Sequence, residues 1–513
     1  MELEFRSPSS PSEWAITSTI TLLFLILLRK ILKPKTPTPN LPPGPKKLPL
    51  IGNIHQLIGG IPHQKMRDLS QIHGPIMHLK LGELENVIIS SKEAAEKILK
   101  THDVLFAQRP QMIVAKSVTY DFHDITFSPY GDYWRQLRKI TMIELLAAKR
   151  VLSFRAIREE ETTKLVELIR GFQSGESINF TRMIDSTTYG ITSRAACGKI
   201  WEGENLFISS LEKIMFEVGS GISFADAYPS VKLLKVFSGI RIRVDRLQKN
   251  IDKIFESIIE EHREERKGRK KGEDDLDLVD VLLNLQESGT LEIPLSDVTI
   301  KAVIMDMFVA GVDTSAATTE WLMSELIKNP EVMKKAQAEI REKFKGKASI
   351  DEADLQDLHY LKLVIKETFR LHPSVPLLVP RECRESCVIE GYDIPVKTKI
   401  MVNAWAMGRD TKYWGEDAEK FKPERFIDSP IDFKGHNFEY LPFGSGRRSC
   451  PGMAFGVANV EIAVAKLLYH FDWRLGDGMV PENLDMTEKI GGTTRRLSEL
   501  YIIPTPYVPQ NSA

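Results

Sequence analysis

The chain has 513 residues, of which 42% are hydrophobic and 27% are charged, and its formal net charge is −1. These values are typical of a globular protein with a large buried core, and the near-neutral charge argues against a nucleic-acid partner. The four cysteines, Cys197, Cys383, Cys387 and Cys450, are too few for a disulfide framework and suit a reducing compartment.

The first part of the chain is predicted to be a membrane anchor. The run Trp14–Leu28 carries no charge, and the basic residues Arg29 and Lys30 follow it. The run is shorter than the ~20 residues that span a bilayer, but it lengthens if the two basic side chains reach the headgroups. We expect residues 1–33 to form a single-pass anchor, with a buried core helix as the alternative. By the positive-inside rule, the rest of the chain then faces the cytosol.

Residues 34–50 are rich in proline, which favours an extended hinge between the anchor and one large domain over residues 51–513. The apolar spacing in this domain predicts a mainly helical fold with a minor β region. We expect a solvated loop in the charged run 263–278. The predicted helices cover residues 135–170, 206–218, 243–265, 297–328, 331–345 and 453–470, and the predicted strands lie within residues 76–90, 387–402 and 471–506.

The longest predicted helix covers residues 297–328. Ser296 or Asp297 can cap its start, and the pair Asn329–Pro330 ends it. Near its middle, Gly311 and the hydroxyl of Thr314 are expected to loosen the backbone hydrogen bonds. Without other information, a bent core helix explains this pattern as well as a functional site does.

A second helical stretch, KETFRLHP, carries a charge pair. Glu367 and Arg370 are three residues apart, so they share one helix face and can form an ion pair. A pair at this spacing is most often an ordinary surface pair.

The stretch PFGSGRRSCPG surrounds Cys450. Pro451 suits a first helical turn, so we expect Cys450 at a helix N-terminus, where N–H groups favour a thiolate. The glycines at 444, 446 and 452 let the backbone approach a large flat group, and Arg448 can meet a carboxylate on that group. These features describe an axial haem ligand, with a buried structural cysteine as the alternative.

Phe443, Gly446, Arg448, Cys450 and Gly452 fit the pattern F-x-x-G-x-R-x-C-x-G. This pattern resembles the haem-binding loop of the cytochrome P450 monooxygenases. The runs LPPGPKKLPLIGN, FSPYGDYWRQLRK and YLPFGSGRRSCPG are similar to plant microsomal members, which include terpenoid oxidases. The resemblance implies the cytochrome P450 fold and haem b, with Cys450 as the iron ligand and Phe443, Gly446 and Arg448 around the haem.

The resemblance also implies roles for residues elsewhere in the chain. In VAGVDTSAATTE, Thr314 would steady oxygen at the iron and Asp313 would help to deliver protons. Trp134 and Arg138 match a W-x-x-x-R contact to a haem propionate, and Arg381 matches a second basic contact.

A further motif of the family is a buried ion network that holds the cysteine loop. The E-x-x-R pair Glu367 and Arg370 contributes to it, and Arg425 in FKPERF is the third member that the resemblance implies.

The implied reaction inserts one atom of O2 into a C–H bond of a small substrate. The substrate pocket would be mostly apolar and would offer no paired charge to an ionic substrate, which suits a bulky hydrocarbon-like molecule. The resemblance to the plant subgroup that contains terpenoid oxidases implies a sesquiterpenoid or diterpenoid. An indole alkaloid or a phenylpropanoid is the alternative. The pocket residues implied by family position are Met112, Ile113, Val114, Met305, Phe308, Val309, Val375, Leu377, Leu378 and Ile490.

The expected partners are NADPH-cytochrome P450 reductase and the lipid of the endoplasmic reticulum membrane, because the chain carries no dinucleotide or flavin fingerprint. Arg135, Lys139 and Arg447 could form a basic docking patch for the reductase. Two other classes remain open. A haem-thiolate isomerase or dehydratase would often lack the threonine at position 314, and a non-catalytic haem-binding membrane protein would not need Asp313 and Thr314.

Overall fold

The computed structural model describes residues 39–201, 208–210, 213, 224–231, 234, 240–268, 272, 275–347, 349–476, 478–489 and 491–508. The chain divides into two units, residues 1–41 and residues 42–513, and the second contains all the elements below. The predicted anchor at 1–33 lies outside the described residues. Within the described ranges, no helix combines the length and the apolar character needed to cross a membrane.

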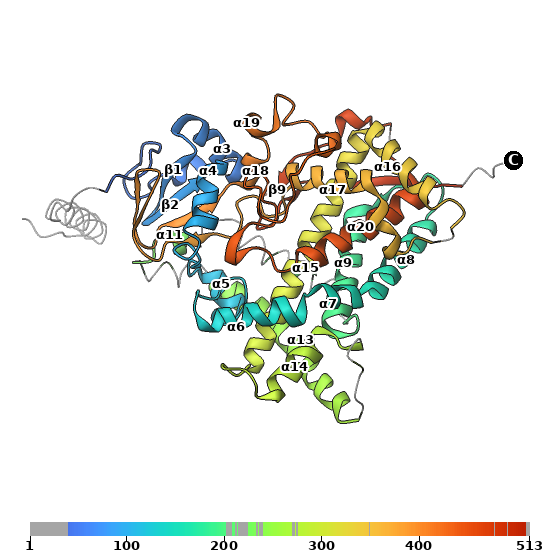
Figure 1. The fold of residues 1–513 in the computed structure, drawn as a ribbon, viewed down its shortest axis with the longest axis horizontal. Helices are drawn as coiled ribbons and strands as arrows, with labels where there is room; N and C mark the ends of the chain where they lie inside the picture. Colours follow the sequence, from blue (N-terminus) through green and yellow to red (C-terminus); the bar gives the residue numbers. More distant parts are fainter. Residues whose placement is uncertain are drawn as a thin grey trace, which may run out of the picture. The chain divides into compact units, whose positions relative to one another are not determined.

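Most of the second unit is helical, as the sequence predicts (Figure 1). The α-helices are α2 (Ile54–Leu57), α3 (Pro62–His73), α4 (Lys92–Glu96), α5 (Ile113–Val118), α6 (Asp132–Ile140), α7 (Ala148–Ser153), α8 (Arg155–Arg170), α9 (Phe180–Cys197), α11 (Phe224–Ala227), α13 (Ile240–Gly268), α14 (Leu278–Ser288), α15 (Asp297–Lys328), α16 (Pro330–Lys343), α17 (His359–Leu371), α18 (Ala404–Met407), α19 (Thr411–Trp414) and α20 (Met453–His470). Short π or 3-10 turns are η1 (Lys97–Thr101), η2 (Thr141–Leu145), η4 (Glu352–Asp357), η5 (Pro423–Phe426), η6 (Gly446–Arg448) and η7 (Pro481–Asn483).

The strands form small sheets. The largest has the order β1-β2-β7-β4, with β2 parallel to β7 and the other neighbours antiparallel. Every predicted strand region contains strands. They are β1 (Ile76–Leu81), β2 (Leu84–Ile89), β3 (Ile178–Asn179), β4 (Arg381–Glu382), β5 (Cys387–Ile389), β6 (Tyr392–Ile394), β7 (Lys399–Val402), β8 (Phe471–Arg474), β9 (Glu488–Lys489), β10 (Arg495–Arg496) and β11 (Tyr501–Pro506).

Helix α15 has the predicted bounds. The Ser296 hydroxyl accepts a hydrogen bond from the Thr299 amide at 3.2 Å, and Asn329 follows the last turn. Helix α15 is continuous through its middle, where the Thr314 hydroxyl shares the Ala310 carbonyl at 2.6 Å, and the loosening of the backbone hydrogen bonds there stays a prediction. A Cβ atom at Gly311 would lie 3.2 Å from the Thr192 side chain, so this glycine allows α9 to pack closely against α15.

Two other sequence predictions need correction. The predicted helix over 135–170 is broken into α6, η2, α7 and α8. The charged run at 263–278 begins inside α13, because Arg263 forms an ion pair with Asp297 at 2.7 Å and thereby fastens the end of α13 to the start of α15.

The core surrounds α15, which packs against α9, α20 and α17. The large core cluster takes residues from the second half of α15 together with α16, α17 and α20, and a second cluster takes the first half of α15 with α9, α13 and α14. In Figure 1, α15 lies between the strands β1 and β2 on one side and α8, α16 and α20 on the other. Helix α15 therefore passes through the interior of this unit and contributes to both core clusters, where it can supply residues to an enclosed site.

Candidate functional site

The loop before α20 presents the sulfur of Cys450 to an internal cavity, called the inner cavity, of about 270 Å³. Cys450 has an exposed surface only because it faces this cavity; protein atoms surround the residue on every other side. The predicted helix bounds 453–470 are confirmed, since α20 begins at Met453 and Gly452 is its cap. Pro451 therefore lies before the first turn, and Cys450 lies three residues ahead of the helix rather than in that turn. The Cys450 amide donates to the Phe443 carbonyl at 2.9 Å, which fixes the loop as a closed turn.

Two groups act on the Cys450 sulfur. Burial raises the pKa of the Cys450 thiol, while a hydrogen bond from the Gly452 amide and the charge of Arg138 oppose that rise. The expected support of the sulfur by a backbone N–H group therefore comes from one amide, and a thiolate needs a further positive charge in the cavity.

Four arginines line the inner cavity: Arg109, Arg138, Arg381 and Arg448. Burial lowers the pKa of Arg448 to about 9, and the positive charge of Arg381 is the next largest cause. Burial, followed by Arg448 and Arg381, also holds the pKa of Arg109 well below its ordinary value. The arginines thus crowd one another, which favours an anion in this cavity.

The backbone holds three of these arginines in place. Arg448 donates to the carbonyls of Ala107, Ile125 and Ser128, and Arg109 donates to those of Thr126, Val379 and Pro380. Arg381 pairs with Asp103 at 2.7 Å and donates to the Ser445 carbonyl at 2.6 Å.

Aromatic side chains and Arg138 complete the inner wall. The Arg448 guanidinium lies over the Trp134 ring, with its Cζ atom 4.1 Å from the ring centroid. The Trp134 indole N–H donates to the Ile125 carbonyl at 3.0 Å. Arg138 donates to the Ser449 hydroxyl at 3.3 Å, and Phe443 also lines the cavity.

These residues fit a haem. The Cys450 sulfur, which forms no disulfide, lines one cavity together with guanidinium groups for two propionates and with apolar side chains. The sequence did not reveal Arg109, since a single arginine before a proline carries no local signal of burial.

Gly446 differs from the prediction, because it does not line the inner cavity. Its φ of +72° favours glycine, and a Cβ atom there would lie 2.2 Å from the Leu99 carbonyl oxygen. Gly446 therefore lets the loop approach the turn η1 rather than the cofactor.

Glu367 joins the two arginines of the predicted network. Arg370 makes two hydrogen bonds of 2.7 Å to the Glu367 carboxylate, and Arg425 makes one of 2.9 Å. All three side chains are buried. Nearby, Phe369 of α17 packs edge-on against Phe443 of the cysteine loop, with ring centroids 5.0 Å apart. The network and the loop therefore share α17 as their support.

A second cavity of about 260 Å³, called the outer cavity, adjoins the inner one. Thr314, Asp306 and Leu378 line both cavities. Leu378 has a φ of +51°, a strained conformation for leucine that places it at the junction. The Thr314 hydroxyl donates to the Ala310 carbonyl at 2.6 Å, so its oxygen stays at the wall that the two cavities share.

The carboxylate of Asp313 lies outside both cavities. Arg495 of β10 holds Asp313 with hydrogen bonds of 3.0 and 2.8 Å and also binds Asp185 at 2.7 Å. Glu320 lies 3.8 Å from the same guanidinium. Burial raises the pKa of Glu320, and the charge of Asp185 adds to this rise while the charge of Arg495 opposes it. No sequence motif indicates Arg495, which is 182 residues away from Asp313.

Asp306 fastens the loop at 124–127 to α15. It accepts hydrogen bonds from the Ile125 amide at 2.7 Å and from the Thr126 hydroxyl at 3.0 Å. Burial, followed by the charge of Asp124, holds the pKa of Asp306 well above its usual range. The Ile125 carbonyl of this loop accepts hydrogen bonds from Trp134 and Arg448. Asp306 thus ties the loop that holds these two side chains to the helix that contains Thr314.

Most of the predicted pocket residues line the outer cavity: Met112, Val114, Met305, Val309, Val375, Leu377 and Leu378. Ile113 does not, and its amide donates to Asp226 at 3.0 Å. Phe308 lies in the core between Tyr189 and Phe255, with ring centroids 5.9 and 6.0 Å away. Ile490 lies outside the described residues.

The sequence predicts a pocket that offers no paired charge to a substrate, but charged residues of both signs line the outer cavity. The lining of the outer cavity includes Asp226, Asp306, Lys399 and Lys489. Strand β7 and helix α11 bring two of them, Lys399 and Asp226, together from distant parts of the chain, so the local sequence could not reveal the charges.

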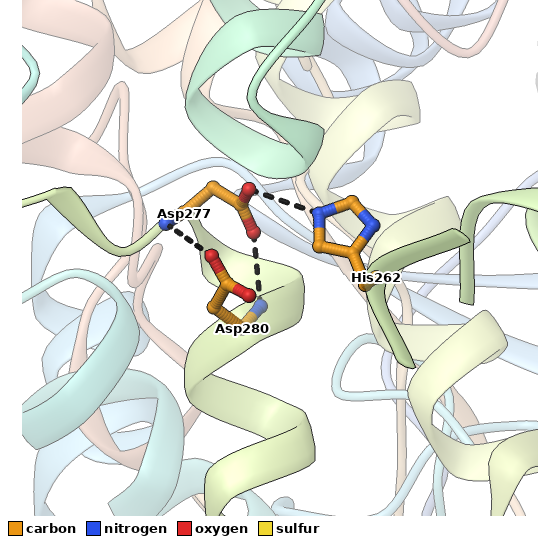
Figure 2. A group of neighbouring side chains, drawn as sticks. All are labelled: His262, Asp277 and Asp280. Carbon is orange, nitrogen blue, oxygen red and sulfur yellow. Dashed lines mark hydrogen bonds and ion pairs between the residues drawn. The ribbon is translucent and has the colours of Figure 1, made fainter. Parts of the chain in front are cut away.

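A separate buried cluster, drawn in Figure 2, joins His262, Asp277 and Asp280. Asp277 caps α14 by accepting the Asp280 amide at 2.9 Å, and its other oxygen contacts His262 Nε2 at 2.9 Å. His262 Nδ1 contacts the Ile258 carbonyl at 2.7 Å. Both ring nitrogens are occupied, which favours a cap between α13 and α14 over a metal site.

Comparisons with known proteins point to one family. The sequence model of the family described as "Cytochrome P450" matches residues 42–499. The chain is 50% identical to premnaspirodiene oxygenase of Hyoscyamus muticus over 95% of its length and 97% of that protein. It is 49% identical to tabersonine 16-hydroxylase 2 of Catharanthus roseus over 95% of its length and 96% of that protein.

Solved structures agree in fold. A zebra fish cytochrome P450 determined with abiraterone superimposes with a TM-score of 0.74, covering 87% of this chain and 99% of that chain at 22% identity.

Proposed function

The chain belongs to the cytochrome P450 family, and from this premise we propose that it oxidises a bulky and largely apolar terpenoid. The expected fold and haem cofactor are confirmed, and the protein is a haem-dependent monooxygenase. The observation that carries the proposal is the junction of two cavities, both of which Thr314 lines. Cys450 and four arginines line one of them, which suits an anionic cofactor bound through sulfur, and the lining of the other is mostly apolar.

In this proposal, Cys450 binds the haem iron through its sulfur. Arg109, Arg138, Arg381 and Arg448 bind the propionates, since all four line the cavity that the sulfur faces. When bound, the haem supplies the activation of dioxygen that oxidation of a C–H bond requires.

The residues of the chain bind the substrate and move protons. The outer cavity excludes water from the substrate, and its junction with the inner cavity directs one C–H bond toward the reacting centre. The Thr314 hydroxyl can turn from the Ala310 carbonyl and hold a proton at Oγ1 beside the substrate. Asp313 can replace that proton after its carboxylate leaves Arg495 and takes up a proton from solvent.

The substrate class rests on the lining and on the relatives. Met305, Val309 and Leu377 are among the apolar residues that surround the outer cavity. The similarity to premnaspirodiene oxygenase favours a sesquiterpenoid or diterpenoid, while the similarity to tabersonine 16-hydroxylase 2 supports an indole alkaloid as the second candidate.

The electrons come from a redox partner, as the family requires. We infer that the partner is NADPH-cytochrome P450 reductase, that residues 1–33 anchor the protein in the endoplasmic reticulum membrane, and that residues 34–50 form a hinge. Helix α6 contacts the cysteine loop through Arg138 and Ser449. Arg447 of the loop is half-exposed, and Arg135 and Lys139 of α6 are exposed, which supports docking at this surface.

One experiment tests the function. The full-length protein, reconstituted with a reductase, is offered terpene hydrocarbons, terpene alcohols and indole alkaloids, and products are identified by mass spectrometry under 18O2. We expect NADPH-dependent products that carry one labelled oxygen atom from terpenoids. Labelled products from the alkaloids alone would move the function to the second candidate, and unlabelled rearranged products would indicate an isomerase.

A further inference from the structure

One face of the sheet β1-β2-β7-β4 forms a wall of the outer cavity. Side chains alternate between the two faces of a strand, so every second residue points to the same side. Lys399 and Met401 of β7 line the cavity, together with Leu84 and Asn86 of β2. Ile400 lies between the first two and packs in the core on the other face.

Lys399 is the cation of this wall. It pairs in register with Asn86 on one side and with Glu382 on the other. Among the described residues, no carboxylate lies within ion-pair distance of its ammonium group, and none accepts a hydrogen bond from it. A lysine ammonium has three N–H donors, so those of Lys399 are available to a molecule in the cavity.

Two carboxylates favour the charged form of Lys399 from a distance. Burial lowers the pKa of Lys399, whereas the charges of Asp226 and Glu382 act in the opposite direction. The Asp226 carboxylate accepts a hydrogen bond from the Ile113 amide at 3.0 Å. The acids therefore favour the ammonium form without occupying its donors.

The position of Lys399 relative to Thr314 gives this cation a direction. Lys399 lines the outer cavity but not the inner one, whereas Thr314 lines both. A molecule held by Lys399 would therefore extend along the apolar wall toward the junction, where Thr314 lies.

We propose that Lys399 binds an oxygen function of the substrate, which is a carboxylate, a carbonyl or a hydroxyl group. The substrate is then a terpenoid that already carries oxygen, and this enzyme oxidises a carbon at the opposite end of the molecule. The inference rests on the proposed function and names its substrate class more closely. An earlier oxygenation must supply such a substrate.

Binding measurements test this assignment in the haem-loaded, full-length protein. Two ligand sets are titrated by the change in the haem absorbance: farnesene, farnesol and farnesoic acid, and then dodecane, dodecanol and dodecanoic acid. The second set depends on the apolar cavity but not on a terpenoid skeleton. The variants are Lys399→Met, Lys399→Arg and the control Lys397→Met, since Lys397 is exposed and lines neither cavity.

We expect the wild-type protein to prefer the acid to the hydrocarbon by about 10-fold or more in Kd, with the alcohol between them. Lys399→Met should remove this preference and leave hydrocarbon binding within about 2-fold, in keeping with loss of one charged contact. Lys399→Arg and Lys397→Met should retain the preference.

Two outcomes would overturn the inference: an acid preference that Lys399→Met leaves unchanged, or no acid preference in the wild-type protein in either set. Absence of binding by all six ligands would contradict it too, because it requires an accessible apolar cavity. If the preference holds but the reconstituted enzyme oxidises no terpenoid, the proposed function fails and the assignment of Lys399 stands.

Discussion

The two cavities of this protein are similar in volume and differ in the charges that line them. Four arginines and a cysteine line the inner cavity, whereas Asp226, Lys399 and Lys489 line the outer cavity alone. Backbone carbonyls accept hydrogen bonds from three of the four arginines, so the positions of these three are fixed before any ligand arrives. Under the proposed function, the difference separates a strongly basic site for the cofactor from a site of mixed charge and mostly apolar lining for the substrate.

The largest effect should come from the sulfur of the inner cavity. Cys450→Ala removes the ligand, so we expect complete loss of the red-shifted carbon monoxide band of the reduced protein. Cys387→Ala is the matched control, because Cys387 is half-buried and lines neither cavity. A band that survives Cys450→Ala would refute the ligand assignment.

The next effect should come from an arginine that the sequence motifs did not indicate. Arg109→Leu should speed the loss of haem by about 10-fold to 100-fold, since a charged hydrogen bond contributes about 1.5–3 kcal/mol. Transfer of haem to an acceptor protein measures the rate. Arg135→Leu removes an exposed arginine of α6 and should change the rate little. Equal rates in the two variants would exclude Arg109 from the propionate site.

A smaller effect is expected at the junction. Thr314→Ala should increase peroxide formation per NADPH several-fold, because the proton at Oγ1 is lost. Thr319→Ala is a control on the same helix, as its hydroxyl donates to the Ser315 carbonyl at 2.9 Å and it lines neither cavity. Coupling of NADPH to product is measured for both. Unchanged peroxide in Thr314→Ala would leave Thr314 without a role in proton transfer.

The smallest effect on activity should come from the outer wall. Val309→Ala should change the product ratio a few-fold with little loss of stability, because it enlarges a cavity that ligands fill. Phe308→Ala should instead lower the free energy of unfolding by about 3–5 kcal/mol, since Phe308 lies in the core. Product analysis and thermal unfolding distinguish the two. A product change of equal size in both variants would contradict the placement of Phe308.

The sequence predicts local features of the fold well. The bounds of α15 follow from Ser296 and Asn329, and the helix over 453–470 follows from its apolar spacing. It predicts less well where a local preference competes with tertiary contacts. The charged run after Arg263 begins as helix because Asp297 binds that arginine.

The candidate site divides in the same way. The motif around Cys450 and the E-x-x-R pair are contiguous or nearly so, and their residues meet through short stretches of backbone. Arg109 and Arg495 have no motif. Arg109 donates to the Val379 carbonyl, 270 residues away, and Arg495 donates to Asp313, 182 residues away. Seven of ten predicted pocket residues line the outer cavity, because family position specifies segments rather than side-chain directions.

By itself, the sequence determined the mainly helical fold, the cysteine loop, the charge pair of α17 and the segments near the substrate. The spacing of residues along a helix or turn is enough for these features, since they depend on neighbours in the chain. Only the tertiary structure decided the crowding of the four arginines, the hold of Arg495 on Asp313 and the position of Lys399 in an apolar cavity. Burial and electrostatic interactions between distant residues depend on how the chain packs in space, which a linear pattern does not record.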